Sequence, residues 1–502
     1  MNDILKRQIK EQEIQLEELL KKYKLLKKLK KNPSLYKKIN KSDTKDNTKD
    51  NTEDNTEDNT YLSDNHCNHH HYHLSSAISM DSNATAHTNT TTTTNANTNA
   101  NAATKAVKYN TPFLGYFSPI DLKNIYNIPV YNKTASSRKV KVAIVIAYQY
   151  TSLKPDFDIW WKKYFPTTTT PTVNQYYMGS NSNTTNPNIT NKSVIADWNT
   201  EECIDVQMLA AANPNAEIWV VEASSRTQID LLNAVRYATN TLKADVVSCS
   251  WGLPDYNSIS TATYNSYFTN PNTCYCVSSG DTNTVSWPSV LSNVISVGGT
   301  TVNYYNKLPF LSERTSTNCV ETNWNSSGCG YSATIPMPSY QNSVNTQTTT
   351  PKYRCTPDIS LVGNPDSGVN VYCSAVFPGQ TNGNGWSVYG GTSVACPIFA
   401  GILSLAIQNR INNNKTKALT SVWSGVSGSP TDIYNVQNYL YKTIYPNKST
   451  STSEPTSYSN CMYDITLGIQ NILYMTGTGY DIPTGLGSVN STKFCTALLN
   501  IP

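Results

Sequence analysis

The chain after residue 108 contains five short apolar runs. They are nearly continuous, without the alternation of half-exposed strands, which is typical of buried strands in a parallel sheet. The runs lie at residues 140–148, 216–223, 244–251, 273–279 and 293–299. Helical segments are expected between them, at about 200–212 and 228–241. This order predicts an α/β fold: a doubly wound, mostly parallel sheet flanked by helices.

The N-terminal 106 residues have a different pattern. Residues 1–31 place apolar side chains at heptad spacing before Pro33, so residues 1–40 are expected to form a basic helix or a short coiled coil. A basic helix on a membrane surface is a third interpretation. Self-association or tethering through residues 1–31 follows from the coiled-coil interpretation. Residues 41–106 are low-complexity sequence and predict a disordered linker, so the globular domain is expected at 108–502.

Charge and composition limit the classes of binding partner that we expect. The net charge is +4, and the excess Lys lies in the first 40 residues, so no nucleic-acid partner is expected. No apolar stretch approaches the roughly 20 residues needed to cross a bilayer, so no transmembrane segment is expected. The polar N-terminus does not resemble a signal peptide, and the compartment stays open. The 12 Cys permit disulfides without fixing a pairing.

Histidine is confined to one short tract. All six His lie between His66 and His87, and none lies in the expected domain. A Ser-His-Asp triad, a Cys-His pair and a His-ligated zinc site are therefore excluded within that domain. The tract itself could hold a metal, although low-complexity sequence produces such runs without a site. If the domain is a hydrolase, a carboxylate or a Lys must act as its base.

Ser393 is a candidate nucleophile. It follows Gly390 and Gly391 and precedes an apolar helical segment, with Pro397 expected in the first turn. A hydroxyl at a helix N-terminus is exposed to the positive end of the helix dipole, which favours a developing anion. The alternative is a Ser that caps a buried helix.

Glu201 and Asp205 are candidate partners of that Ser. They stand four residues apart in a segment that we expect to be a helix capped by Thr200, so both carboxyls share one face. Two carboxyls that share a proton have one raised pKa, which makes a carboxylate a usable base. The alternative is a solvated acidic helix start.

Taken together, these segments resemble the sedolisins, or serine-carboxyl peptidases, the family of lysosomal tripeptidyl peptidase. The resemblance covers about residues 111–490. The matching segments are Pro119–Pro129, Glu201–Gln207, Ser278–Asp281, Glu321–Trp324, Gly328–Ser332, Pro338–Gln341, Pro357–Ser360 and Gly390–Pro397.

The resemblance implies a subtilisin-like fold and hydrolysis of peptide or protein substrates at acidic pH. It makes Ser393 the nucleophile, Glu201 the base and Asp205 its partner, and Asp281 a protonated donor to the oxyanion. The substrate walls are implied to be Ser250, Trp251 and Gly252 on one side and Gly328 and Gly330 on the other. Whether cleavage is internal or removes tripeptides stays open.

One Ca²⁺ is also implied near the C-terminus. Asp464 and Asp481 stand among Gly-rich turns, and carboxylates with backbone carbonyls suit a hard cation. The resemblance assigns the two carboxylates and the carbonyls of Ile465, Gly477 and Gly479 as ligands. The alternative is a pair of turns without a metal.

Two features depart from the family. Nothing before residue 108 resembles its folded propeptide, so the route of activation is open. The family is mostly secreted or lysosomal, yet no signal peptide is visible; packaging in a particle is one hypothesis. A catalytically silent peptidase fold, tethered by its N-terminal helix and used for structure or binding, is the alternative function.

Overall fold

The computed structural model describes residues 116–502, except 180–191, 256–261, 305–313, 316–317, 349, 381–384, 426–428, 452–453 and 471–473. The N-terminal helix, the linker and the His tract lie outside the described residues, so those interpretations stay predictions.

A central sheet organises the described domain. Its strand order is β12-β8-β6-β4-β1-β3-β2, and every neighbouring pair is parallel. The strands are β1 (Lys141–Ala147), β2 (Val173–Tyr177), β3 (Glu217–Ala223), β4 (Val246–Cys249), β6 (Cys274–Ser278), β8 (Ile295–Tyr304) and β12 (Ile359–Val362), with β9 (Cys319–Asn323) antiparallel to β8. All five predicted strands are confirmed. The sequence analysis missed β2, which is largely polar, and β12, which is only four residues long.

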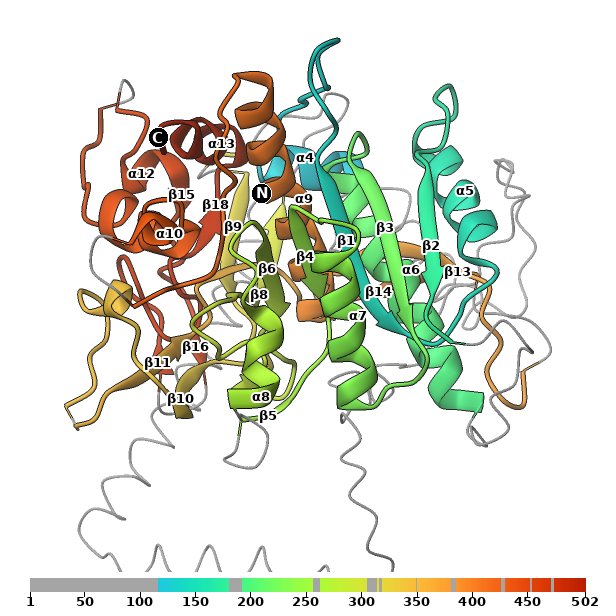
Figure 1. Ribbon diagram of the computed structural model, residues 1–502, viewed down its shortest axis with the longest axis horizontal. Helices are drawn as coiled ribbons and strands as arrows, with labels where there is room; N and C mark the ends of the chain where they lie inside the picture. The colour runs from blue at the N-terminus through green and yellow to red at the C-terminus, as the bar shows by residue number, and fades with distance from the viewer. Residues whose placement is uncertain are drawn as a thin grey trace, which may run out of the picture. The chain divides into compact units, whose positions relative to one another are not determined.

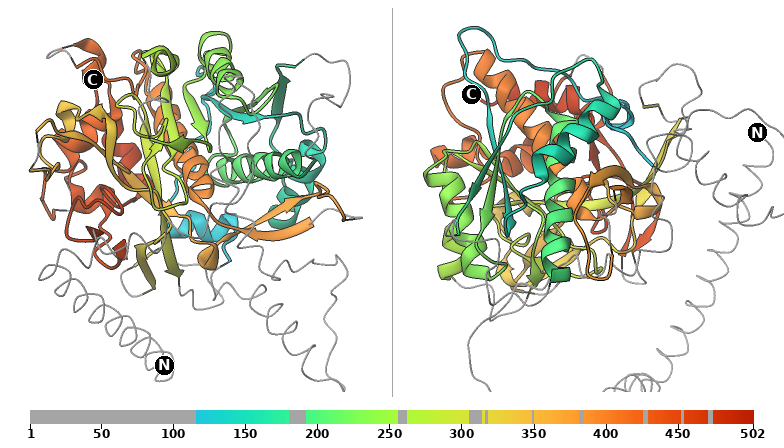
Figure 2. Two further views of the ribbon diagram at one scale, coloured as in Figure 1. Left: turned by 90° about the horizontal axis from the view of Figure 1, so that it is seen from below. Right: turned by 90° about the vertical axis from the view of Figure 1, so that its right-hand side faces the viewer.

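Long helices cover both faces of this sheet. Helix α7 (Gln228–Asn240) packs on β1, β3 and β4, and α9 (Thr392–Asn412) packs on β4, β6, β8 and β12 from the opposite face (Figure 1). Helix α6 (Lys192–Ala212) lies on the same face as α9, and the two pack side by side (Figure 2). The α/β prediction is therefore confirmed.

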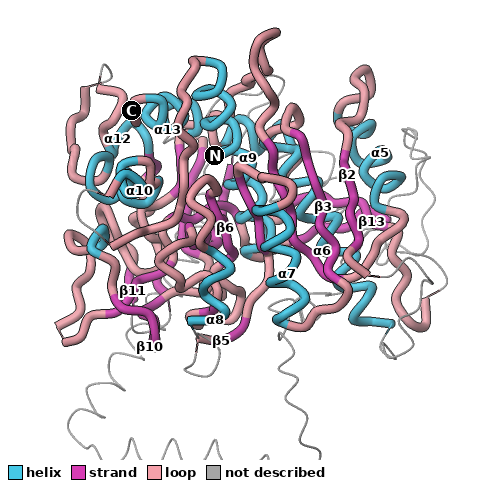
Figure 3. The backbone as a smooth tube through the Cα atoms, in the orientation of Figure 1, coloured by secondary structure: helices cyan, strands magenta, loops and turns pink. Residues whose placement is uncertain are grey.

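The remaining elements lie around the sheet, and most of them are short. Much of the C-terminal part consists of loops joined by brief helices and two-residue strands (Figure 3). The other helices are α4 (Pro119–Ile125), α5 (Leu153–Tyr164), α8 (Ala262–Asn265), α10 (Pro430–Ile433), α11 (Val436–Tyr439), α12 (Tyr458–Cys461) and α13 (Ser491–Leu499). The other strands are β5 (Leu253–Pro254), β7 (Ser286–Trp287), β10 (Gly330–Pro336), β11 (Tyr353–Thr356), β13 (Val369–Cys373), β14 (Gly385–Tyr389), β15 (Met462–Tyr463), β16 (Ile469–Gln470), β17 (Tyr474–Met475) and β18 (Ser488–Val489).

The predicted start of α6 was wrong. The helix begins at Lys192, so Thr200 lies in its interior and does not cap it. The Thr200 hydroxyl instead donates to the carbonyl of Ala196 at 2.8 Å, the back-bonding that Thr adopts inside helices. Glu201 and Asp205 are thus mid-helix residues, which removes the interpretation of a solvated acidic helix start.

Two expectations about α9 also need correction. Pro397 lies in the second turn, not the first, so no intrahelical hydrogen bond can form from residue 397 to the Ser393 carbonyl. By length and composition α9 could also cross a membrane, contrary to the expectation that no stretch is long enough. However, 89% of its most apolar stretch is buried inside the domain, as in the core helix of a soluble protein.

Candidate active site

The candidate site forms at the carboxyl edge of the sheet. Ser250 directly follows β4, and Asp281 follows β6, its parallel neighbour. The carboxyl ends of neighbouring parallel strands meet at one edge, which is where α/β folds bind ligands. The topology therefore brings together two residues that stand apart in the sequence.

Helix α6 presents its carboxyl pair to the protein interior. Glu201 is 2% exposed and Asp205 is fully buried. The Ser250 hydroxyl donates to Asp205 Oδ1 at 2.6 Å. Burial raises the pKa of Asp205 well above its usual value, and the hydrogen bond from Ser250 opposes that rise. Asp205 is therefore placed to hold its proton at a pH where exposed carboxyls have lost theirs.

This carboxyl pair faces the first turns of α9. Burial raises the pKa of the Cys396 thiol, and the charges of Asp205 and Glu201 raise it further. Cys396 is one turn beyond Ser393 on α9. Both carboxyls of α6, a helix that packs against α9, therefore act electrostatically on the first turns of α9.

Ser393 is the second residue of α9. The preceding Gly391 has φ +114°, a conformation that residues with a side chain rarely adopt, and it turns the chain sharply into the helix. Ser393 is 2% exposed. A Gly-dependent turn therefore sets the direction from which the Ser393 side chain enters the site.

Asp281 lies against the same helix start. Its Oδ1 accepts hydrogen bonds from the backbone N–H and the hydroxyl of Thr392, both at 2.8 Å. The Thr392 hydroxyl in turn accepts from the N–H of Gly280 at 3.1 Å. Because Thr392 is the chain neighbour of Ser393, the Asp281 carboxyl is held beside the predicted nucleophile.

A second buried carboxyl pair was missed from the sequence. Glu202 on α6 and Glu222 near the end of β3 are both fully buried, and their carboxyl groups interact electrostatically. Burial raises the pKa of both, and for Glu202 the nearby charge of Glu222 adds to the rise. Glu222 also accepts from the N–H of Tyr150 at 3.0 Å and from Gln175 at 2.9 Å. The apolar run around Glu222 was the available signal, since a lone Glu in a buried strand needs a partner.

The five predicted substrate-wall residues lie around this edge. The Trp251 side chain is buried and donates to the Val145 carbonyl at 3.0 Å, so it packs in the core. Gly328 donates its N–H to the Gly280 carbonyl at 2.6 Å, and a Cβ there would overlap the Ser279 carbonyl. Gly252 follows Trp251, and Gly330 begins β10. Their contact with substrate stays a prediction.

The predicted calcium residues meet in one corner of the C-terminal region. Both carboxylate oxygens of Asp464 accept from the N–H of Gly479, at 3.0 and 2.9 Å. Asp481 Oδ2 accepts from the N–H of Gly477 at 3.0 Å. Ile465, next to Asp464, is buried. The structure thus brings the two carboxylates and the Gly-rich turn together, and calcium binding by them stays a prediction.

The chemistry of this corner suits a cation. Burial raises the pKa of Asp481 to about 7, and the charge of Asp464 adds to the rise. A bound cation stabilises two neighbouring carboxylates that repel each other, here the buried Asp481 and the partly buried Asp464. Lys448 also lies close, since its ammonium group acts on Asp464 and rests 3.8 Å from the Tyr445 ring centroid.

Comparison with known proteins identifies the family. Residues 179–457, more than half of the chain, match the Peptidase S8, or subtilase, family. The chain belongs to the subtilase family. It is 30% identical over 217 residues to sedolisin from Pseudomonas sp. (strain 101), covering 43% of this chain and 30% of that relative. It is 27% identical over 328 residues to kumamolisin from Bacillus sp. (strain MN-32), a match that covers 59% of this chain and 50% of that relative.

A solved structure has the same fold as this chain. A solved complex of Pseudomonas sedolisin, a serine-carboxyl proteinase, with pseudo-iodotyrostatin superposes with a TM-score of 0.55 and 22% identity. The superposition covers 76% of this chain and 98% of the sedolisin chain, which confirms the subtilisin-like fold. The matches span half or less of the length of the curated relatives.

The matched subtilase segment includes all four predicted catalytic residues. Glu201, Asp205, Asp281 and Ser393 lie within the matched residues, whereas Asp464 and Asp481 lie beyond them. The matched segment contains no His, so the usual Ser-His-Asp triad cannot form within it. Their individual roles stay predictions.

Proposed function

We propose that this domain hydrolyses peptide bonds of peptide or protein substrates by a serine-carboxyl mechanism. The observation that carries the proposal is that α6, with its two buried carboxyls, packs against α9, and that both carboxyls act electrostatically on Cys396, one turn beyond Ser393. Asp281, held by Thr392, completes the set from the β6 side.

In this mechanism Ser393 attacks the carbonyl carbon of the substrate while Glu201 removes the hydroxyl proton. Asp205 holds Glu201 in place and shares its proton, and Ser250 fixes Asp205 through the 2.6 Å hydrogen bond. Glu201 then passes the proton to the leaving amine, and a water molecule hydrolyses the acyl-enzyme by the reverse sequence.

Asp281 would stabilise the oxyanion of the tetrahedral intermediate. Its Oδ1 accepts two hydrogen bonds from Thr392, so the proton of a neutral Asp281 belongs on Oδ2. That O–H and the backbone N–H of Ser393 would form the oxyanion hole. A carboxyl donates only while it is protonated, so activity is expected to fall as the pH rises through its pKa.

The C-terminal corner fits a calcium ion with a structural role. The carboxylates of Asp464 and Asp481 would hold it, with the carbonyls of Ile465, Gly477 and Gly479. When bound, the ion supplies positive charge that removes the repulsion between the two carboxylates and ties together loops that have little regular structure.

Peptide hydrolysis across a range of pH tests the proposal. Purified full-length protein, and protein trimmed of its N-terminal tail, is incubated with a peptide mixture from about pH 3 to about pH 8. Cleavage with an acidic optimum, identified by mass spectrometry and lost in Ser393→Ala, supports it. Product lengths distinguish internal cleavage from removal of tripeptides. No cleavage at any pH by either form favours the silent peptidase fold.

A further inference from the structure

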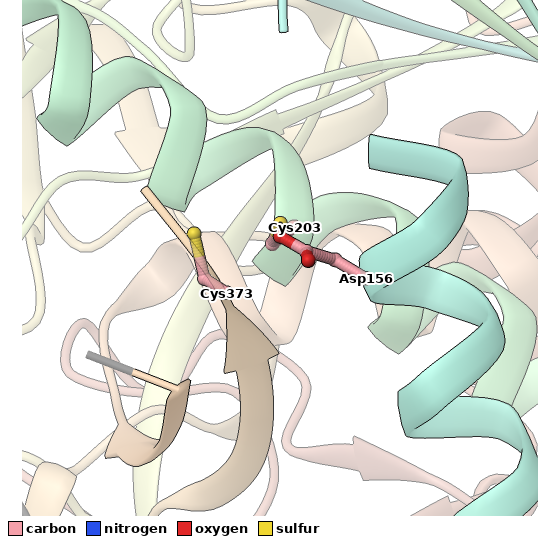
Figure 4. Close-up of side chains that lie close together, drawn as sticks. All are labelled: Asp156, Cys203 and Cys373. Atoms are coloured by element: carbon pink, nitrogen blue, oxygen red, sulfur yellow. Dashed lines mark hydrogen bonds between the residues drawn. The ribbon is translucent and has the colours of Figure 1, made fainter. Parts of the chain in front are cut away.

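Two buried thiols meet beside the carboxyl pair. Cys203 lies on α6 between Glu201 and Asp205, and Cys373 is the last residue of β13. Their sulfur atoms and a carboxylate oxygen of Asp156 lie within 4.8 Å of one another. Figure 4 shows the three side chains converging from α6, β13 and α5. The thiols are far apart in the sequence, and nothing in the proposed mechanism uses them.

The backbone around this thiol pair is already fixed. Gln207, one turn beyond Cys203 on α6, donates to the Tyr372 carbonyl at 2.7 Å and accepts from the Tyr372 N–H at 3.0 Å. Tyr372 directly precedes Cys373. The two chain segments are therefore held together independently of the sulfur atoms, so a covalent bond between the thiols requires little movement of the backbone.

The third member of the cluster has a structural role. Asp156 Oδ2 accepts from the Tyr150 hydroxyl at 2.6 Å and from the N–H and hydroxyl of Ser374 at 2.7 and 3.1 Å. This oxygen has no remaining capacity for a metal ion without loss of those hydrogen bonds. The carboxylate thus fixes the end of β13 to α5, which favours thiol chemistry at this cluster over metal binding.

We propose that Cys203 and Cys373 form a reversible disulfide that links the carboxylate-bearing helix α6 to β13. The oxidant is a small or protein disulfide. The inference does not depend on peptidase activity, because it rests on the placement of the two thiols.

The reaction proceeds by thiol–disulfide exchange. The Cys373 thiolate attacks the external disulfide, forms a mixed disulfide and releases one thiolate. Cys203 then loses its proton and attacks the Cys373 sulfur, which releases the second thiolate. Two cysteine thiols are oxidised by two electrons, one external disulfide is reduced to two thiols, and both protons pass to the released thiolates.

The surroundings assign the order of these steps. Interaction with Cys203 lowers the pKa of Cys373, and the N–H of Ala375 donates to the Cys373 sulfur at 3.5 Å. Burial raises the pKa of Cys203. Cys373 also ends its strand beside the partly exposed Ser374, so fraying of the strand end gives an oxidant access to it. Cys373 is therefore the attacking thiol and Cys203 the resolving one.

Native oxidation with thiol mapping tests the disulfide. The full chain is treated with oxidised glutathione, remaining thiols are alkylated after denaturation, and peptides are analysed by mass spectrometry. The expected result is a peptide containing Cys203 linked to one containing Cys373. The melting temperature should rise by about 3 °C or more, reversibly with a reductant.

Matched variants make the result specific. Cys203→Ser and Cys373→Ser should each lack the cross-link and the gain in melting temperature. Cys495→Ser, which removes a buried thiol on α13, should keep both. Full alkylation of Cys203 and Cys373 after native oxidation, or cross-linking of either to another cysteine, overturns the proposal. So does stoichiometric zinc that the untreated protein retains and Cys203→Ser loses, because the cluster would then be a metal site.

Discussion

The Ser250 hydroxyl donates a 2.6 Å hydrogen bond to Asp205, joining the end of a central strand to the carboxyl pair on α6. A hydrogen bond to an ionised carboxylate stabilises the charged form, whereas burial of that carboxylate favours the neutral form. The protonation of the pair is therefore set by the balance between Ser250 and the surrounding core.

Ser250→Ala should change the pH dependence of hydrolysis. Loss of the donor leaves burial unopposed, so the pKa of Asp205 rises further. The acidic limb of the pH–rate profile should move to higher pH, and the rate at the optimum should fall about tenfold. Ser248→Ala, on the same strand but in contact with Cys396, is the control. A profile for Ser250→Ala that coincides with the wild type contradicts this role.

Asp281→Asn should retain more activity than Asp281→Ala. The Asn carbonyl can still accept from Thr392, and its amide can donate from the position of Oδ2 at every pH. Removal of an oxyanion donor costs about 10²–10³ in rate, so Asp281→Ala should lose that factor. The alkaline limb should weaken in Asp281→Asn, which steady-state rates at several pH values measure. Equal losses in both variants would argue against hydrogen-bond donation by Asp281.

The main strands and the spacing of the candidate site residues could be predicted from the sequence, whereas the packing of the elements could not. The strands that bury both faces were predictable because their apolar runs are continuous, as in β1 and β3. The carboxyls of α6 were predictable because their spacing defines a helix face. Their burial was not, since it depends on how α6 packs against α9 and the end of β4.

Contacts between residues far apart in the sequence could not be predicted from the sequence alone. The approach of Glu202 to Glu222 depends on how α6 is positioned relative to β3, which no local sequence pattern encodes. The approach of Cys203 to Cys373 depends likewise on the docking of β13 by Gln207. The calcium corner was recognised only through the family resemblance, because Asp and Gly in turns are common without a metal.

The Glu202–Glu222 pair should make the fold more stable in acid than at neutral pH. Burial raises both pKa values, so the folded chain keeps protons that the unfolded chain releases. This stabilisation is full below the unfolded pKa of about 4.3 and is lost as the pH rises toward the folded values, by up to about 1.4 kcal/mol per pH unit for each proton.

Melting temperatures from about pH 4 to about pH 8 measure this effect. The decline with rising pH should be smaller in Glu222→Gln than in the wild type. Glu217→Gln, at the partly exposed start of the same strand, should keep the full decline. An identical decline in the wild type and Glu222→Gln would show that the pair does not hold the extra proton.

Chelation should lower stability if the C-terminal corner binds calcium. Free calcium at about 100 times its Kd stabilises the folded state by about 2.7 kcal/mol, and a chelator removes this. Differential scanning fluorimetry with and without EDTA should show the loss in the wild type and no response in Asp481→Asn. Asp366→Asn, at an exposed position, should respond as the wild type does. A wild-type melting temperature indifferent to EDTA and to added calcium would refute the site.

The most direct test of the mechanism is to trap the acyl-enzyme. Protein at acidic pH is mixed with an excess of peptide substrate, quenched within the first turnover, digested and analysed by mass spectrometry. The account predicts an acyl group of the substrate on Ser393, and neither adduct nor hydrolysis in Ser393→Ala. Hydrolysis that persists in Ser393→Ala, or an adduct on a different residue, would contradict it.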